Sequence, residues 1–496
     1  MKNKLDDFIL NKVLCEKSLY DFTKQAFKVL KPHDKFVDNW HIELLCDYLQ
    51  CVAKNIPVHE SVRHLFKGLS SDFRITQLLI CMPPRSLKSV CVSTTLNAWH
   101  WIENPFEQFL CASSTYKLSV EHALNCRKII FSDWYRLAWG LNYNLAEDQN
   151  TKNNYRTNFG GSRNSVSVDS KVTGMNGDIL IADDLNDMGE VESVAKRNTA
   201  LNFWNQVFST RENDPEKSRK IIMQQRGHAL DIAGDVIEKE NEIPVTKLIL
   251  KAEATEDEDW YSPLTGKLLH SRKCGDVLCE KRLNKEFLRK RKKQLGERAY
   301  NAQFQQKPNT DSGNIIKPHF FKRLAEDPKP VRILQSIDTA FKEGEENDYS
   351  VCLTAYEYII EGISHFYIKH ISKGRWGFPE LFTRVRANIK NFKPHKVLIE
   401  DKASGQSIIQ QLRTEYDLKV VVEAVRVDKD KVARAYAITN IIEQGRVSIP
   451  ESAPWIAEFI DELESFPFGS HDDSVDTLTK LLNWAVNKKT AQVRTF

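Results

Sequence analysis

The sequence contains no apolar run of about 18 residues, so we expect no membrane-spanning helix. Its first twenty residues carry too many charges for a secretory signal peptide, and none is expected. Internal repeats and low-complexity tracts are also lacking. The chain has little excess of one sign of charge, because 71 basic residues against 67 acidic ones leave a net charge of +4. A surface that binds nucleic acid would therefore have to be local.

Paired cysteines at metal-binding spacing are lacking as well. The ten cysteines are scattered, and the closest pairs, Cys46/Cys51 and Cys274/Cys279, have no second pair or histidine partner nearby. We interpret all ten as reduced thiols of a cytosolic protein, which excludes a disulfide framework and a zinc site. What the chain does have is length and apolar content: 496 residues with 41% hydrophobic residues predict two or more domains with sizeable cores.

The hydrophobic pattern changes along the chain. Residues 1–70 show helical spacing, and residues 71–250 alternate short apolar strands with helical segments, which predicts a mainly parallel α/β sheet with flanking helices. Residues 251–330 are charged and include a basic run at 289–293, so we interpret them as a linker or bridging region. Residues 331–490 read as a second domain, which begins with antiparallel strands and continues as α/β.

The segment LLICMPPRSLKS ends an apolar strand with a tight turn. A strand, a turn and a helix in this order are typical of a phosphate-binding loop, in which Lys88 reaches the β- and γ-phosphates and Ser89 ligates Mg²⁺. Met82 and Leu87 stand where the consensus loop has glycines, which allow close approach of the backbone. The alternative is a proline-rich turn without a ligand.

A second strand, Ile179 to Ala182, ends in Asp183 and Asp184. A nucleotide site needs carboxylates at such a strand end to bind Mg²⁺ and to polarise the attacking water. We assign Mg²⁺ to Asp183 through its water shell and activation of water to Asp184; an Asx turn is the alternative.

Two arginines are candidates for contact with the γ-phosphate. Arg85 lies within the turn, and Arg226 follows the strand that ends at Met223. A surface salt bridge is the alternative for each of them.

The C-terminal half carries three acidic groups at the ends of expected elements. Asp338 ends one strand, Glu400 ends another, and a helix begins within HDDSVD, which contains Asp472, Asp473 and Asp476. Two strand ends and a helix start that converge in one pocket are the arrangement in which a ribonuclease-H-like fold binds two Mg²⁺ or Mn²⁺ ions for phosphodiester cleavage. Acids at strand ends and helix N-termini are also common without metal. Asp348 and Lys431 are further candidates near this pocket.

These residues, in their order and spacing, resemble the large terminase subunits of tailed bacteriophages and prophages. The resemblance covers about residues 20–485. The matching stretches are WHIE (40–43), MPPRSLKS (82–89), SDWYR (132–136), VTGMNGDILIADDL (172–185), STR (209–211), IIMQQRGHALDIAGD (221–235), AQFQQKP (302–308), SIDTAF (336–341), VLIEDKASG (397–405) and FPFGSHDDSVDTL (466–478).

The resemblance implies an N-terminal P-loop ATPase domain followed by a ribonuclease-H-like nuclease domain. Loops without the glycines are common in this family, and its loop arginine falls on Arg85. The family's coupling segment falls on Gln225 and Arg226, and its catalytic Glu is here Asp184. The implied roles are these: catalysis by Asp184, Arg85, Asp338, Glu400 and Asp473; nucleotide binding by Arg85, Ser86, Lys88, Ser89, Asp183, Gln225 and Arg226; metal binding by Ser89, Asp183, Asp338, Glu400, Asp472, Asp473 and Asp476.

The resemblance further implies a motor that uses ATP and Mg²⁺ to drive double-stranded DNA into a procapsid, and a Mg²⁺- or Mn²⁺-dependent nuclease that cuts concatemeric DNA. The implied partners are the portal protein and a small terminase subunit, with a ring of identical subunits on the portal, a monomer in isolation, and no membrane. We expect it in the cytoplasm of the bacterial host and transiently at the portal vertex. The alternatives are an ATP-dependent helicase or repair translocase fused to a nuclease, and an inactive prophage relic.

Overall fold

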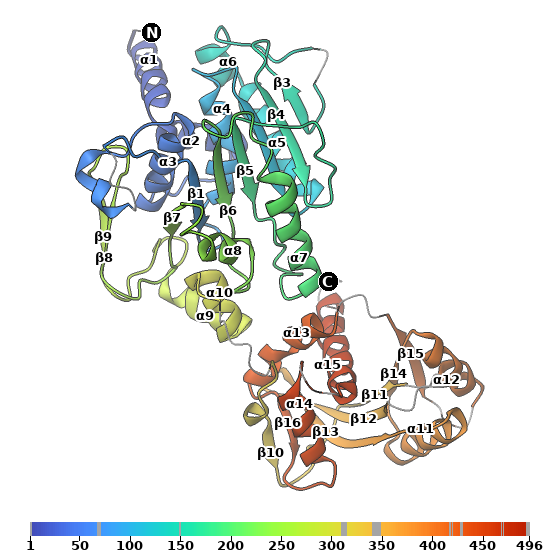
Figure 1. Cartoon of the computed structure of the whole chain (residues 1–496). Coiled ribbons are helices and arrows are strands. Elements are labelled where there is room, and N and C mark those ends of the chain that lie inside the picture. The colour runs from blue at the N-terminus through green and yellow to red at the C-terminus, as the bar shows by residue number, and fades with distance from the viewer. Residues whose placement is uncertain are drawn as a thin grey trace. The chain divides into compact units, whose positions relative to one another are not determined.

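The computed structural model describes residues 2–66, 71–147, 150–308, 315–339, 349–415, 418, 420–426, 430–467, 469 and 471–492. Two compact units divide the chain, Met1–Thr310 and Asp311–Phe496, and each contains a seven-stranded sheet (Figure 1). All ten cysteines are free thiols. Across the described part of the chain, no helix is both long and apolar enough to span a bilayer.

The first unit begins with the helical segment that the sequence predicts and continues as an α/β sheet. Its strand order is β3-β4-β2-β5-β6-β1-β7, and every pairing is parallel except that of β3 with β4. The elements of the sheet and its helices are α1 (Lys2–Lys17), α2 (Leu19–Leu30), α3 (Trp40–Ala53), η1 (Glu60–Leu65), β1 (Gln77–Cys81), η2 (Val90–Thr95), α4 (Leu96–His100), β2 (Gln108–Ser113), α5 (Tyr116–Ile130), α6 (Asp133–Trp139), β3 (Asn154–Arg156), β4 (Ser162–Ser167), β5 (Ile179–Asp183), α7 (Val194–Asn202), η3 (Phe203–Phe208), β6 (Arg219–Met223), α8 (Ile232–Glu238) and β7 (Thr246–Ile249).

Alternating side chains of the buried strands face two separate cores. Leu78 and Ile80 of β1 join a core with helices α2 to α6, whereas Leu79 and Cys81 join a second core with α7, η3 and α8. Successive side chains of a strand point to opposite faces, so a strand that is covered by helices on both faces is a continuous apolar run. This explains why the run that begins at Leu78 shows no alternation with polar residues.

Residues 251–308, most of the segment we interpret as a linker, belong to the first unit. They contain the hairpin β8 (Glu258–Tyr261) and β9 (Leu268–Arg272), which the sequence analysis did not predict, and the helices α9 (Lys285–Leu295) and α10 (Glu297–Gln305). The hairpin contacts α3 through the Trp40 indole, which stacks on His270 at 4.9 Å between ring centroids. Tyr300 and Phe304 of α10 are buried in the first core, so the surface charge of this segment conceals an apolar side.

The second unit has the strand order β10-β16-β13-β12-β11-β14-β15, with β12 antiparallel to both of its neighbours. The antiparallel start and the α/β continuation are as the sequence predicts. Its elements are η4 (Pro318–Phe320), β10 (Lys322–Leu324), β11 (Arg332–Asp338), β12 (Ser350–Ile360), β13 (Ile363–Gly374), α11 (Phe378–Phe392), β14 (Lys396–Glu400), α12 (Ala403–Thr414), β15 (Val421–Val425), α13 (Lys431–Glu443), β16 (Val447–Pro450), α14 (Ile456–Ser465) and α15 (Asp473–Gln492).

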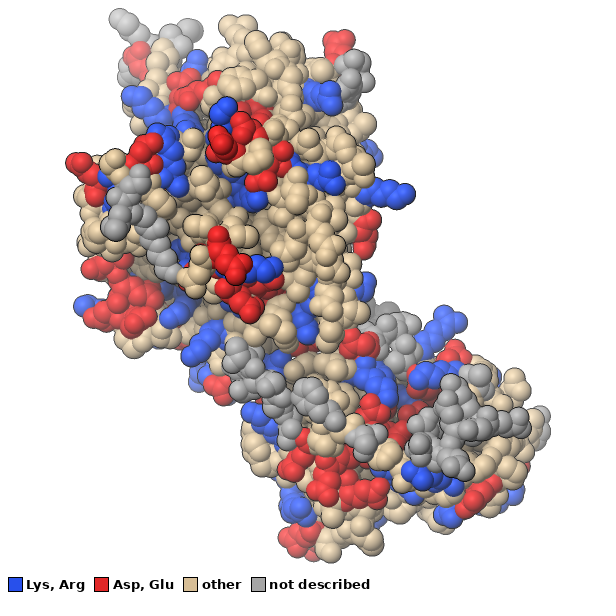
Figure 2. Space-filling view, in the orientation of Figure 1, with Lys and Arg blue, Asp and Glu red and all other residues tan. Residues whose placement is uncertain are grey.

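Helices cover both faces of this second sheet. On one face, Leu334, Val351 and Phe366 pack with α13, α14 and α15, and on the other, Ile337 and Val397 pack with α11 and α12. The view in Figure 2 shows acidic and basic side chains interspersed over the surface of each unit, in keeping with the small net charge.

Candidate nucleotide and nuclease sites

The carboxyl ends of the central strands of the first sheet lie at one edge. Ile80 of β1 and Asp183 of β5 both align with Met223 at the end of the intervening strand β6. The loop after β1, the acids after β5 and the segment after β6 therefore meet at this edge, which is where α/β sheets bind ligands.

The loop 82–89 contains no glycine, yet two of its residues have a left-handed backbone. Arg85 and Leu87 have φ angles of +68° and +65°, the left-handed region that glycine enters at little cost. Lys88 is buried, and its Nζ lies 3.4 Å from the Asp184 carboxylate. Among the described residues neither the Lys88 Nζ nor the buried Ser86 hydroxyl has a hydrogen-bond partner. Buried polar groups normally have partners, so these two atoms fit a bound phosphate.

Asp183 is buried beside η2, the helix that follows the loop 82–89. Its Oδ2 accepts a hydrogen bond from Ser93 and lies 3.2 Å from His122 Nε2, while its Oδ1 has no partner within the described part of the chain. Burial, and secondarily the charge of Asp184, raises the pKa of Asp183 to about 7. We predicted Ser89 as the hydroxyl of this site; the hydroxyl that contacts Asp183 in the structure is that of Ser93, one helical turn later.

Asp184 lies at the junction of three segments. Its backbone has a φ of +48°, its carboxylate faces Lys88, and its Oδ1 accepts a hydrogen bond from the backbone N–H of Gln225. The Gln225 side chain in turn donates to Gln303 of α10. The predicted coupling segment is thereby connected to the predicted water-activating acid on one side and to α10 on the other.

The two candidate arginines differ. Arg85 is exposed, and its guanidinium lies over the Phe287 ring of α9 at 5.7 Å from the centroid. Arg226 is buried, with its Nε 3.0 Å from Asp231, a fully buried acid that also caps α8. Arg226 therefore forms a salt bridge, but a buried one and not the surface pair of the alternative, and its contact with a nucleotide stays a prediction.

His41 is a contact that the sequence analysis missed. Its Nε2 lies 3.2 Å from the carbonyl oxygen of Ser86 and thereby holds the middle of the loop against α3. Burial lowers the pKa of His41 to about 4, so the ring is neutral at pH 7. The position of His41 in the WHIE stretch was the available signal, but its partner is 45 residues away.

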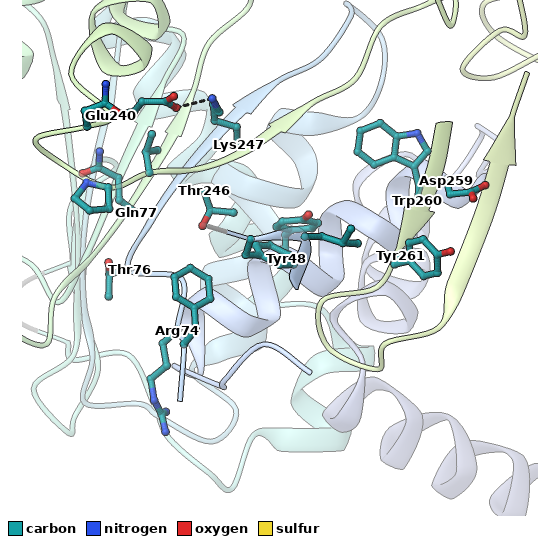
Figure 3. Close-up of a pocket in the computed structure, with 16 residues that line it drawn as sticks. Tyr48, Arg74, Thr76, Gln77, Glu240, Thr246, Lys247, Asp259, Trp260 and Tyr261 are labelled. Atoms are coloured by element: carbon teal, nitrogen blue, oxygen red, sulfur yellow. Dashed lines mark hydrogen bonds and ion pairs between the residues drawn. The ribbon is translucent and has the colours of Figure 1, made fainter. Parts of the chain in front are cut away.

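A cavity of about 570 Å³ lies at the other edge of this sheet. Its lining includes Gln77 and Thr246 at the amino ends of β1 and β7, Tyr48 of α3, and Trp260 and Tyr261 of β8 (Figure 3). Its charged lining includes the Glu240–Lys247 ion pair. The cavity is therefore separate from the loop 82–89, which follows the carboxyl end of β1.

The second unit brings the predicted acids together around one buried lysine. Asp338 ends β11 and Glu400 ends the adjacent parallel strand β14, while Asp473 and Asp476 occupy the first turn of α15. Lys480 of α15 is buried, donates a hydrogen bond to the carbonyl oxygen of Ile337, and has its Nζ 3.8 Å from Asp338.

Most of these acids have a cationic partner. Glu400 pairs with Lys402 at 2.8 Å, Asp472 with Lys431 at 2.8 Å, and Asp476 with Arg434 at 2.8 Å and with Lys431 at 3.0 Å. Asp473 differs, because burial and the charges of Asp338, Glu462 and Asp472 raise its pKa to about 7.

The carboxylates are suitable ligands for Mg²⁺ or Mn²⁺ in type. Among the described residues, however, no three acid, histidine or cysteine side chains are arranged closely enough to hold a metal ion. The metal-binding roles of Asp338, Glu400, Asp472, Asp473 and Asp476 therefore stay predictions. Asp348, the further candidate, lies outside the described residues.

Lys480 is a residue of this pocket that was not predicted from the sequence, although its spacing from the acids of the same helix indicates that it lies beside them. Lys480 follows Asp476 by four residues and Asp473 by seven, which places all three on one face of α15. Burial lowers the pKa of Lys480, whereas the charges of Asp338, Glu400 and Asp476 oppose that shift. A lysine in the middle of an apolar helix face is expected to have such partners.

Comparison with known proteins identifies the second unit. Residues 335–484 match the family model of the terminase RNaseH-like domain. The predicted resemblance to large terminase subunits is confirmed.

The solved large terminase of thermophilic bacteriophage D6E, in its second crystal form, is 11% identical and covers 87% of this chain and 99% of that one, with a TM-score of 0.50. This chain shares the α/β fold of that large terminase, and the predicted fold class is confirmed.

Other solved structures match at lower TM-scores. The D6E large terminase in complex with ADP is 10% identical over 86% of this chain and 98% of that one, with a TM-score of 0.47. The large terminase nuclease of thermophilic phage G20c with bound magnesium is 17% identical over 34% of this chain and 95% of that one, with a TM-score of 0.25. The comparison with curated proteins returned no match.

Proposed function

We propose that this chain is a DNA-packaging motor that hydrolyses ATP in its first domain and cuts DNA with divalent metal ions in its second. The observation that carries the proposal is the pair of buried polar atoms in the loop 82–89, Lys88 Nζ and Ser86 Oγ, which lack hydrogen-bond partners within the described residues. A terminase RNaseH-like domain lies on the same chain. The buried Lys88 ammonium in this loop and the nuclease-type domain on the same chain together support an enzyme that hydrolyses a nucleotide and acts on DNA.

In the first domain, Lys88 would neutralise the charge of the transferred phosphate and Asp184 would orient and deprotonate the attacking water. The 3.4 Å contact between Lys88 and Asp184 supports these two roles, because the phosphate and the attacking water must lie next to each other during hydrolysis. Ser89 and Asp183 would hold Mg²⁺, which supplies charge stabilisation when bound. Arg85 is exposed, and among the described residues its guanidinium contacts the Phe287 ring, so it can turn toward a γ-phosphate.

In the second domain, Asp338, Glu400 and Asp473 would supply the carboxylates for Mg²⁺ or Mn²⁺, with Asp472 and Asp476 beside them. Burial, and secondarily the charges of Asp338 and other acids, raises the pKa of Asp473, so a bound cation would relieve the repulsion between Asp473 and Asp338. Metal binding would require Asp338 and Glu400 to turn away from Lys480 and Lys402.

The proposed substrate is concatemeric double-stranded DNA, cut to begin and end packaging and moved through a portal protein. A small terminase subunit would supply sequence recognition, and a ring of identical subunits would assemble on the portal from monomers. We place this work in the cytoplasm of the bacterial host. The near-neutral net charge supports a protein that must both hold and release DNA.

The test measures ATP hydrolysis and cutting of linear duplex DNA by the full chain, with Mg²⁺ or Mn²⁺. Both activities should be present in the wild type and absent from a Lys88→Ala/Asp338→Ala double variant. A preparation that hydrolyses no ATP and cuts no DNA, with or without portal, would refute the proposal. Unwinding of a forked duplex would instead favour the helicase alternative.

A further inference from the structure

The basic run 289–293 is a sequence feature that the two sites do not use. It lies in α9, whose eleven residues include six Lys or Arg and one Glu. Its net positive charge therefore exceeds that of the whole 496-residue chain. The blue side chains in Figure 2 include basic residues in the area where Figure 1 labels α9.

The helix separates an apolar side from a charged side. Leu288 is buried in the first core, and Phe287 and Leu295 pack against that core from the same side. The exposed positions are Lys285, Glu286, Arg289, Lys290, Lys292, Lys293 and Gln294. Residues at spacings of three, four and seven share one helix face, so the exposed cations form a continuous stripe along α9.

The helix dipole accounts for only part of this stripe. Lys292 and Lys293 lie in the last turn, where cations stabilise a helix by contact with its negative end. Arg289 and Lys290 lie in the middle of the helix, where that effect has faded. Among the described residues the Lys290 ammonium pairs with Glu286 at 2.7 Å, and both side chains are 66% exposed, so this pair adds little stability.

The apolar side of α9 contacts the nucleotide loop directly. Two guanidinium groups lie near the Phe287 ring, that of Arg85 of the loop at 5.7 Å and that of Arg291 of α9 at 5.2 Å from its centroid. Both distances are within the range of cation–π attraction. An anion that binds at the surface of α9 and draws the Arg291 guanidinium away from the Phe287 ring would therefore change the contact of that ring with Arg85.

We propose that the exposed basic stripe of α9 binds the phosphate backbone of duplex DNA, and that Phe287 transmits this binding to Arg85. This inference rests on the proposed function, and it places one of the DNA contacts of that function on α9 of the ATPase domain. The occupant follows from charge complementarity, because a stripe of cations on a straight helix fits the regularly spaced phosphates of a duplex. Contacts of this type carry no sequence information, as a motor that moves along DNA requires.

The first measurement is fluorescence anisotropy with a labelled duplex, over a salt series, on the full chain. Arg289→Gln/Lys290→Gln should bind about tenfold or more weakly at 0.1 M salt, with a slope of log K against log salt smaller by about 2. The matched control is Lys217→Gln/Lys267→Gln, which removes two exposed lysines elsewhere in the same unit and should bind as the wild type does. ATP hydrolysis without DNA should be unchanged in both double variants.

The second measurement is the change in ATP hydrolysis when duplex DNA is added. Phe287→Leu keeps an apolar side chain against the core but removes the ring, so DNA affinity should be retained while the DNA-dependent change in rate falls several-fold. An unaltered response in Phe287→Leu would overturn the role of Phe287, and unaltered affinity in Arg289→Gln/Lys290→Gln would overturn the inference alone. Wild-type protein that binds no duplex would overturn the proposed function and this inference with it.

Discussion

The two candidate sites balance their charges in opposite ways. In the first domain, the Ser86 hydroxyl and the Lys88 ammonium have no hydrogen-bond partner among the described residues, although the Lys88 ammonium lies 3.4 Å from the Asp184 carboxylate. In the second domain, the acids Glu400, Asp472 and Asp476 already have cationic partners within the protein. Unpartnered buried groups are costly, whereas paired ones are tolerated. The difference fits the proposal of a first site that a nucleotide phosphate completes and a second site whose acids the protein's own cations hold.

The largest expected effect is that of Lys88→Ala. Loss of the ammonium removes the positive charge that faces the transferred phosphate, so ATP hydrolysis should fall by at least about 10²-fold. Cutting of duplex DNA in the same preparation should be retained, because Lys88 belongs to the first unit. Lys54→Ala, which removes another partly buried lysine of this unit, is the matched control and should hydrolyse ATP normally. Hydrolysis that survives in Lys88→Ala would mean that the loop is not the nucleotide site.

Asp338→Ala should give the reverse pattern. Cutting should fall by at least about 10²-fold, because the carboxylate between β11 and α15 would be lost from the proposed metal ligands. ATP hydrolysis should stay at the wild-type rate. Asp327→Ala, which removes an acid that pairs with Lys369 in the same unit, is the control for a general effect of charge. Cutting that persists in Asp338→Ala would sink the metal-site assignment.

The sequence predicted those features that depend on local pattern. The strand ends at Asp338 and Glu400 agree with the structure, because short bounded apolar strands are set by residues close in sequence. The hairpin β8–β9 was missed because its strands are mostly half-exposed or exposed and show no apolar alternation. Its stability comes from contacts with α3, such as Trp40 on His270.

The site residues show the same division between local and distant signals. The loop, Asp183 and Asp184 were found because they follow strands directly. The contacts of Asp183 with Ser93 and His122 join segments 60 or more residues apart, which a local pattern does not contain. Arg85 and Arg226 have similar positions after strands, and only the fold reveals that Arg226 is held by Asp231.

The contrast between the domains extends to buried acids outside the sites. Asp47 of the first domain contacts the Ser262 hydroxyl, and burial raises its pKa to about 6. Its folded-state pKa lies above that of an unfolded Asp, so this carboxyl favours the folded state at low pH, and that stability is lost as pH rises from about 4 to 6. Asp47→Asn should therefore raise the free energy of unfolding at pH 8 by about 1 to 3 kcal/mol, with little change at pH 4.

The counterpart in the second domain is Glu357, whose carboxylate lies 2.6 Å from Arg332. Glu357→Gln should destabilise its domain, because it removes the partner of a guanidinium. Thermal unfolding of both variants at pH 4 and 8, with the two domain transitions resolved, measures the contrast. A stabilising Glu357→Gln, or an Asp47→Asn that destabilises at pH 8, would remove the distinction between the domains.

The smallest expected effect tests whether the nucleotide loop depends on its backbone alone. Leu87 has a φ of +65° at a consensus glycine position and is half-buried against the first core. Leu87→Gly relieves about 1 to 2 kcal/mol of left-handed strain, but it loses the packing of Leu87 and loosens the unfolded chain. The net change in unfolding free energy should stay within about 1 kcal/mol, and ATP hydrolysis should be retained. Leu87→Val should lower both stability and hydrolysis, because a β-branched side chain resists positive φ. If Leu87→Gly loses hydrolysis more than tenfold, the leucine side chain itself is required, and the loop would be a distinct solution to phosphate binding.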